Sequence, residues 1–286
     1  MAQLIALLPL TVIQFLGGLI GACCWYKKTA SARITIKNIE LCFPSLSAVE
    51  QQALAKRSVQ EMMKTVLEVG KAWLAPMPVV LAYNHKITEE LDIDAALARG
   101  KGIILVAPHL GNWEILGHYL ANRFEFNALY QPPKIAELDE FVQKARGRVG
   151  TKLHPTDRRG ILGLFKALRN GEVVGVLPDM EPPEEAGVYA PFFGLDALSM
   201  TLVSKLLQKT DAIVVFAYAK RLPAGKGFEV VMKPAPDDIY SADIATSVAA
   251  LNQGVEVCVE AAAEQYQWEY KRFKHKPGGK TRFYKF

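Results

Sequence analysis

The sequence predicts an α/β fold in which a mixed, mostly parallel sheet is flanked by helices. Short runs of wholly apolar residues, such as residues 102–107, are typical of strands that are buried on both faces, as in a parallel sheet. These runs alternate along the chain with stretches whose apolar residues recur at helical spacing. Alternating strands and helices favour a sheet that carries helices on both of its faces.

The expected elements follow from the apolar pattern and from its interruptions. Residues 32–43 form a short mixed segment that ends at Pro44. A helix is expected to begin at Ser47, with Glu50 placed for a capping box, and to end before Pro76. Strands are then expected at 102–107, 126–130, 173–177, 212–218 and, at the sheet edge, 228–233, and helices at 112–122, 137–147, 160–169, 199–210 and 244–264.

The first 26 residues carry no charged side chain, and Lys27 and Lys28 follow them directly. An apolar run of about 20 residues can span the hydrocarbon core as a helix. Basic residues after such a segment, with none before it, place the rest of the protein on the cytoplasmic side. We therefore expect residues 1–28 to form a membrane anchor helix and residues 29–286 to form a single domain that faces the cytoplasm.

The same segment allows other interpretations. Pro9 and the pair Gly17-Gly18 weaken a simple spanning helix, so a buried core helix is the alternative. Together with Gln14, these glycines also permit a helix that lies in the plane of the membrane. The sequence leaves the choice between a spanning and an in-plane helix open.

The net charge of +5 is concentrated at the C-terminus, where residues 271–286 hold seven basic side chains and no acid. Such a local basic segment, interleaved with aromatic residues, suits an anionic membrane surface or an acidic protein partner. A similar pattern occurs in single-stranded nucleic-acid binding, but the apolar N-terminus argues against that class. The four cysteines show neither metal-ligand spacing nor a disulfide framework, which favours a reducing compartment.

Residues 108–114 lie where an apolar strand meets a helix. Ligands of open α/β sheets bind beyond the carboxyl ends of the strands, so His109 stands where a reactive group is expected. Glu114, in the first turns of the helix, can reach back to the His109 ring and leave its other nitrogen free to act as a general base. Gly111 permits a tight turn, and the amides that open the helix could face an oxyanion. The alternative is a structural histidine at a strand end and a solvated glutamate.

The histidines do not form a metal motif. An H-E-x-x-H sequence is absent, and we expect neither a metal nor another cofactor. Cys23 and Cys24 have no basic neighbour that would lower a thiol pKa, so a catalytic cysteine is not expected.

Residues 108–114 resemble the His-x-x-x-x-Glu block of the bacterial lipid A biosynthesis (late, or secondary) acyltransferases, which include lauroyl- and myristoyltransferases. That block is a variant of the His-x-x-x-x-Asp motif of glycerolipid acyltransferases. Other segments resemble further blocks of the family, in the same order: residues 38–44, Arg159 with 168–172 and 177–179, 191–194, and 266–268 with 272–274. The resemblance covers nearly the whole chain and implies a glycerolipid-acyltransferase-like fold with an N-terminal membrane helix.

The resemblance also implies a reaction. An acyl chain would pass from acyl carrier protein to a hydroxyl of a lipid A precursor, with His109 and Glu114 as the catalytic pair. Arg158 and Arg159 precede a helix, and Asp179 ends a strand near the same sheet edge. A guanidinium there could hold a phosphate of the acceptor or of the donor, and Asp179 could fix that guanidinium or a sugar hydroxyl. We count these three residues and Asn112 as substrate-binding residues.

Three alternatives remain. The acceptor could be another glycolipid, such as a phosphatidylinositol mannoside, or an aminolipid. The enzyme could hydrolyse thioesters, although the chain has no G-x-S-x-G nucleophile elbow. A lipid-binding membrane protein without catalysis is the third, and the presence of both His109 and Glu114 argues against it. The sequence does not indicate the acyl chain length, the hydroxyl that is acylated, the oligomeric state, or whether acyl-coenzyme A can replace the carrier protein.

Overall fold

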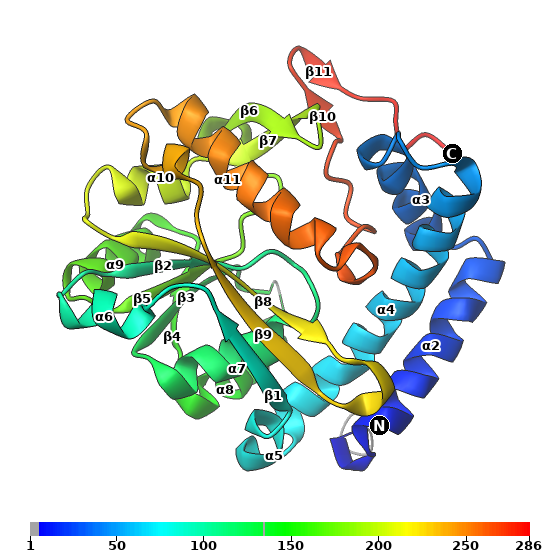
Figure 1. Cartoon of the computed structure of the whole chain (residues 1–286), viewed down its shortest axis with the longest axis horizontal. Helices are drawn as coiled ribbons and strands as arrows, with labels where there is room; N and C mark the ends of the chain where they lie inside the picture. Colours follow the sequence, from blue (N-terminus) through cyan, green and yellow to red (C-terminus); the bar gives the residue numbers. More distant parts are fainter. Residues whose placement is uncertain (1–5, 134) are drawn as a thin grey trace.

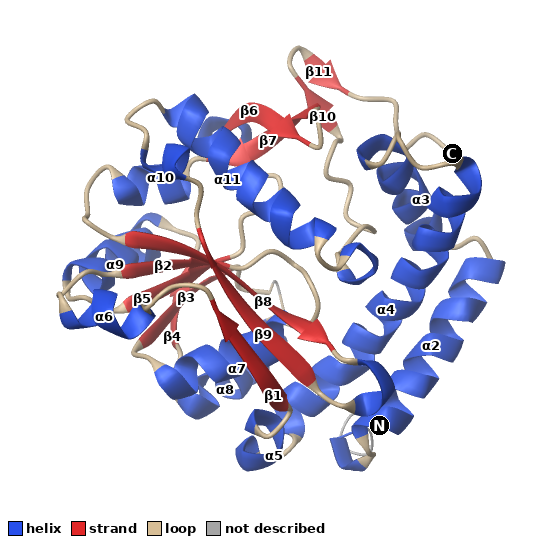
Figure 2. Ribbon diagram, in the orientation of Figure 1, coloured by secondary structure: helices blue, strands red, loops and turns tan. Residues whose placement is uncertain are grey.

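A computed structural model describes residues 6–133 and 135–286 of the chain (Figures 1 and 2). Its centre is a seven-stranded sheet in the order β1-β9-β8-β2-β5-β3-β4. The strands are β1 (Asn84–Glu89), β2 (Ile103–Val106), β3 (Phe126–Tyr130), β4 (Lys152–Pro155), β5 (Val173–Val176), β8 (Ile213–Arg221) and β9 (Phe228–Pro234).

The sheet is mixed and mostly parallel, as the sequence predicts. Strands β8, β2, β5, β3 and β4 run parallel to one another. Strand β9 returns antiparallel to β8, and β1 lies outside it and parallel to it. All the parallel strands of the central group therefore end at one edge of the sheet.

Helices cover both faces of the sheet, and alternate residues of each central strand point into two separate hydrophobic cores. In β2, Ile104 and Val106 belong to the core shared with α9 (Arg158–Arg169), α10 (Leu202–Leu207) and α11 (Ile244–Glu260). Ile103 and Leu105 belong to the core shared with α6 (Ile93–Ala98) and α7 (Trp113–Arg123). Burial on both faces explains why these strands are continuous apolar runs.

The N-terminal part consists of three helices, α2 (Leu10–Tyr26), α3 (Ala30–Cys42) and α4 (Ala48–Leu74). Helix α2 lies along α4 at one side of the molecule (Figure 1). No single helix among the described residues is long and apolar enough to cross a membrane, and α2 and α3 meet that test only as a pair bent by 83°. The first five residues of the expected anchor lie outside the described residues.

Several sequence expectations are confirmed. Helix α4 begins after Ser47 with the expected capping box to Glu50 and ends two residues before Pro76. The strands expected at 102–107, 126–130, 173–177 and 212–218 correspond to β2, β3, β5 and β8. The helices expected at 112–122, 137–147 and 160–169 correspond to α7, α8 (Ala136–Arg146) and α9, and α11 ends at Glu260 rather than at 264.

The mixed segment 32–43, to which the sequence assigned no structure, is helical, because Thr29 caps α3 and burial of Ile34 and Ile39 outweighs the weak helix propensity of β-branched residues. Two expectations are wrong. Strand β9 is not at the edge, since the largely polar β1 pairs with it.

The second error concerns residues 199–210. They begin as the end of β7 (Leu195–Met200), which pairs with β6 (Gly187–Phe192), and only residues 202–207 are helical. The turn between these strands consists of Phe193 and Gly194, both with positive φ, which suits the two-residue loop of a hairpin. A second, short hairpin, β10 (His275–Lys276) with β11 (Gly279–Lys280), lies near the C-terminus beside β7 (Figure 1).

Candidate active site

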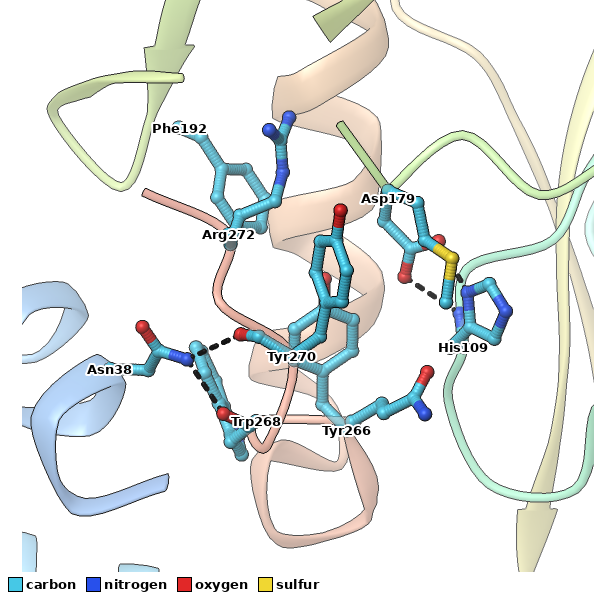
Figure 3. Close-up of a pocket in the computed structure, with 10 residues that line it drawn as sticks. Asn38, His109, Asp179, Phe192, Tyr266, Trp268, Tyr270 and Arg272 are labelled. Atoms are coloured by element: carbon cyan, nitrogen blue, oxygen red, sulfur yellow. Dashed lines mark hydrogen bonds and ion pairs between the residues drawn. The ribbon is translucent and has the colours of Figure 1, made fainter. Parts of the chain in front are cut away.

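Two neighbouring strands bring His109 and Asp179 together. His109 comes three residues after the end of β2, and Asp179 comes three residues after the end of β5. Because β2 and β5 are adjacent and parallel, both side chains emerge at the same carboxyl edge of the sheet. The two residues face each other across one end of the pocket drawn in Figure 3.

The carboxylate of Asp179 holds both the ring and the backbone of His109. Its Oδ1 lies 2.7 Å from Nδ1 of the ring, and its Oδ2 accepts a hydrogen bond from the His109 amide at 2.8 Å. Since a carboxylate can only accept, Nδ1 carries the proton in this pair. In the neutral ring, Nε2 is then left with its lone pair, as a general base requires.

Burial would disfavour the charged form of Asp179, whose side chain is only 3% exposed. Its electrostatic attraction to His109 and the hydrogen bonds that it accepts from His109 outweigh that cost, so the pKa of Asp179 lies below its ordinary value. Tyr266 lies on the other side: burial, and then the neighbouring charge of Asp179, raise its pKa well above the ordinary value. Asp179 is therefore the ionised group and Tyr266 the neutral one.

The loop that carries His109 is fixed by its backbone. Gly111 has φ of +64°, and a Cβ at this position would lie 1.9 Å from the carbonyl oxygen of Ala219, so no other residue fits without a shift. The amides of Gly111 and Asn112 donate to the carbonyls of Gln265 and Ala219. The amide of Gln267 donates to the His109 carbonyl at 3.0 Å, which joins the loop to the C-terminal segment.

The sequence led us to expect that Glu114 contacts the His109 ring, but its hydrogen-bond partners lie elsewhere. Its carboxylate accepts from the indole Nε1 of Trp73 at 2.8 Å and from Nε of Arg146 at 3.0 Å, with a second bond from Nη2 of Arg146. Helix α7 begins at Trp113, and this places the Glu114 side chain toward α4 and α8 and away from the ring. The carboxylate on the His109 ring is that of Asp179.

Glu114 is nonetheless a charged group in the interior. Burial raises its pKa, but Arg146 and Trp73 outweigh burial, and the pKa falls below its ordinary value. Arg146 shows the opposite shift, since its attraction to Glu114 exceeds the cost of burial and raises its pKa. The sequence offered no signal for Trp73 or Arg146, which lie 41 and 32 residues from Glu114.

The pocket beside His109 is walled by the C-terminal segment. Tyr266, Gln267 and Tyr270 line it together with Met180. Asn38 of α3 holds this segment in place through hydrogen bonds from its amide to the carbonyls of Trp268 and Tyr270, at 2.6 and 2.8 Å (Figure 3). Residues from the two ends of the chain thus complete the site around the sheet edge.

Comparison with known proteins places this arrangement in a family. The family model described as bacterial lipid A biosynthesis acyltransferase matches residues 1–275. The chain belongs to that family.

Named relatives agree with this assignment. The chain is 29% identical to a lipid A biosynthesis lauroyltransferase of Escherichia coli (strain K12), over 96% of this chain and 90% of that protein. A lipid A biosynthesis palmitoleoyltransferase of the same organism is 29% identical over 97% of this chain and 90% of that protein. A lipid A biosynthesis myristoyltransferase, also of Escherichia coli (strain K12), is 25% identical over 90% of this chain and 79% of that protein. The family resemblance of the sequence blocks is thereby confirmed.

The other residues that the sequence assigned to the site of this acyltransferase do not lie together. Asn112 is fully buried and is the N-cap of α7, with Oδ1 accepting from the Ile115 amide and Nδ2 donating to Glu68. Arg158 and Arg159 follow β4 at the same sheet edge as His109 and are exposed at the start of α9. Three strand steps separate β4 from β2, roughly 14 Å at the usual spacing of neighbouring strands.

Proposed function

We propose that this protein transfers a fatty acyl chain from acyl-acyl carrier protein to a hydroxyl of a lipid A precursor. The family and the names of its relatives support acylation of lipid A. The observation that carries the proposal for the chemistry is the 2.7 Å contact between His109 and Asp179 at the carboxyl edge of the sheet.

In the proposed reaction, His109 acts as the general base. Nε2 takes the proton of the acceptor hydroxyl while its oxygen attacks the thioester carbonyl. The C–S bond then breaks, and the leaving sulfur receives that proton from the imidazolium. Asp179 holds the ring in the required tautomer and stabilises the imidazolium that forms transiently. No covalent enzyme intermediate is needed.

The backbone at the start of α7 suits the developing negative charge. The helix begins directly after the His109 loop, and its N-terminal amides carry the positive end of the helix dipole. We assign to these amides the stabilisation of the tetrahedral oxyanion. Asn112 and Glu114 then serve to position α7, Asn112 as its N-cap and Glu114 through Trp73 and Arg146.

We assign the exposed Arg158 and Arg159 to a phosphate of a substrate, because both stand at the edge where His109 lies. The proposed location is the inner membrane, with the catalytic domain toward the cytoplasm. Exposed apolar side chains along α2 support contact with lipid: Val12, Phe15, Leu16, Leu19 and Ile20.

The test uses membranes that contain the full chain, lauroyl- or myristoyl-acyl carrier protein, and a phosphorylated tetraacyl lipid A precursor. A product heavier by one acyl group, absent with His109→Ala, is the expected result. Cleavage of the thioester without any acylated lipid would instead indicate a hydrolase or a different acceptor. Acylation of another glycolipid or of an aminolipid under the same conditions would show that the proposed acceptor is wrong and that the proposed acyl transfer is right.

A further inference from the structure

A cavity of about 330 Å³ lies at the C-terminal hairpin, apart from the pocket that holds His109. Four lysines line it, Lys271, Lys274, Lys280 and Lys285, together with a histidine, a threonine and Tyr284. No carboxylate lines the cavity. We call it the lysine cleft.

Most of the positive charge in the lysine cleft is uncompensated. Lys274 and His275 share the buried carboxylate of Glu181, with N–O distances of 3.3 and 2.9 Å. Within the described part of the chain, Lys271, Lys280 and Lys285 have no carboxylate within 4.0 Å. Three ammonium groups around one small cavity repel one another, and a bound anion would relieve that repulsion.

The two hydroxyl side chains that line the lysine cleft, Tyr284 and Thr281, are hydrogen-bonded within the protein. The Tyr284 hydroxyl donates to Oδ1 of Asn38 at 2.6 Å and accepts from the amide of Phe273 at 3.1 Å. Thr281 is bonded through its hydroxyl to the Phe273 carbonyl. These polar groups are engaged within the protein, so the lysine ammonium groups remain as the donors for a ligand.

The lysine cleft is connected to the site of His109 through two residues. Asn38, which receives the Tyr284 hydrogen bond, also holds the backbone of Trp268 and Tyr270 in the wall of the active-site pocket (Figure 3). Glu181, which anchors Lys274 and His275, lies two residues after Asp179. Tyr284 of the lysine cleft and the wall of the pocket in which the chemistry is proposed to occur are therefore joined through the side chain of Asn38.

We propose that the lysine cleft binds a phosphate monoester on the headgroup of the lipid acceptor, an inference that rests on the proposed function. The size of the cavity suits a phosphate with part of a sugar, whereas an acidic protein surface would need a much larger contact, of about 800 Å² per partner. Four lysines that line one small cavity suit a compact, doubly charged anion.

The neighbourhood of the cleft favours a lipid as the source of that phosphate. After the hairpin the chain runs to α3 (Figure 1), where the Arg33 guanidinium stacks over the ring of Phe286 at 5.3 Å. Phe286 is 58% exposed, and α2, which precedes α3, carries the row of exposed apolar side chains. Aromatic and basic residues of this kind are typical of the boundary between a membrane and water.

The test compares two matched triple variants. The first, which we call the cleft variant, is Lys271→Gln/Lys280→Gln/Lys285→Gln. The second, the control variant, is Lys101→Gln/Lys166→Gln/Lys205→Gln, which removes the same charge from exposed lysines outside both cavities. Both are assayed with a phosphorylated acceptor and with the same acceptor after phosphatase treatment. If the first triple variant does not fold, as judged by its thermal melt, the single variants Lys271→Gln, Lys280→Gln and Lys285→Gln replace it.

For the wild type, removal of the phosphate should raise KM for the acceptor about tenfold or more. The cleft variant should show most of that rise already with the phosphorylated acceptor, with a further rise after phosphatase treatment that is much smaller than in the wild type and with kcat within about twofold. The control variant should behave as the wild type. An equal rise of KM for both acceptors in the cleft variant would overturn the proposal.

Two further measurements distinguish a lipid headgroup from other ligands of the lysine cleft. A KM that rises for the carrier-protein donor and not for the acceptor would assign the lysine cleft to an acidic protein surface. Inorganic phosphate that competes with the acceptor as strongly as phosphatidic acid vesicles do would assign it to free phosphate. Either result would overturn the proposal for a lipid headgroup.

A binding experiment keeps this test independent of catalysis. The full chain is floated with phosphatidylcholine vesicles, with and without phosphatidic acid, whose headgroup is a phosphate monoester. The gain in binding caused by phosphatidic acid should be several-fold smaller for the cleft variant than for the control variant. That result would support binding of a lipid phosphate in the lysine cleft even if the acceptor in the proposed function is wrong. An equal gain for the two variants would overturn the proposal.

Discussion

Arg221 of β8 donates two hydrogen bonds to the carboxylate of Glu68 of α4, at 2.7 and 2.6 Å, and both side chains are almost wholly buried. The same carboxylate accepts from Asn112, the N-cap of α7, at 3.0 Å and from Gln14 of α2 at 2.8 Å. One buried ion pair thus ties the N-terminal helices to the loop that carries His109.

This relationship predicts a large effect of Glu68→Ala. Removal of one partner leaves the Arg221 charge buried beside Glu61 alone, and such changes cost about 3–5 kcal/mol of stability. Thermal or denaturant unfolding of the purified chain in detergent measures the change. Lys37→Gln, which breaks the half-exposed pair with Glu40, is the control and should cost less than about 1 kcal/mol. Equal effects of the two substitutions would contradict the prediction.

The His109–Asp179 contact predicts that substitution of either residue lowers kcat. His109→Ala should lower kcat by roughly 10²- to 10⁴-fold, the usual contribution of a general base. Asp179→Asn should also lower kcat strongly, up to about 10⁴-fold, because the amide no longer holds the tautomer or stabilises the imidazolium. The exposed His85→Ala is the matched control and should leave kcat unchanged. An Asp179→Asn enzyme with wild-type kcat would exclude this role for Asp179.

The Glu114–Arg146 pair predicts a non-additive double mutant. Glu114→Ala and Arg146→Ala should each lower kcat: Arg146→Ala leaves the buried Glu114 carboxylate without its ionic partner, and Glu114→Ala removes the carboxylate of α7 that the half-buried Arg146 holds. If Glu114 acts through Arg146 on the position of α7, the double variant should lose little more than either single variant. A direct role of Glu114 on the His109 ring gives another pattern, in which Arg146→Ala keeps most of the activity while Glu114→Ala loses it.

The sequence predicted those parts of the molecule whose causes are local. The strands β2 and β5 were visible because burial on both faces requires continuous apolar runs, and α4 was visible because Ser47 and Glu50 form a capping box. The position of Asp179 near His109 also followed from the sequence, since the carboxyl ends of parallel strands share one edge.

Other parts depend on contacts between distant segments and left no local signal. Strand β1 is polar and forms because the backbone of β9 offers it a free edge. Glu114 was assigned to the His109 ring because it is close in sequence, whereas its actual partners come from α4 and α8. Local spacing could show that a carboxylate was available but not in which direction α7 would present it.

Glu269, beside the active-site wall, predicts a pH dependence of stability. Burial raises its pKa from 4.5 to about 7, and its buried Oε2 has no hydrogen-bond partner within the described part of the chain. Below pH 4.5 the group is protonated in both folded and unfolded chains. As the pH rises from 4.5 to about 7, the unfolded chain ionises first, so the folded state loses stability through this window. Glu269→Gln stays neutral at every pH and avoids this loss.

The melting temperature of Glu269→Gln relative to the wild type should therefore rise between pH 4.5 and pH 8, by a few degrees. Glu140→Gln, which removes an exposed carboxyl group on α8, is the control for the loss of a negative charge. The difference between the two variants isolates the buried group, because both remove one carboxylate and differ in its burial. A difference in melting temperature that stays constant across this pH range would show that Glu269 ionises equally in the folded and unfolded chains, contrary to the prediction.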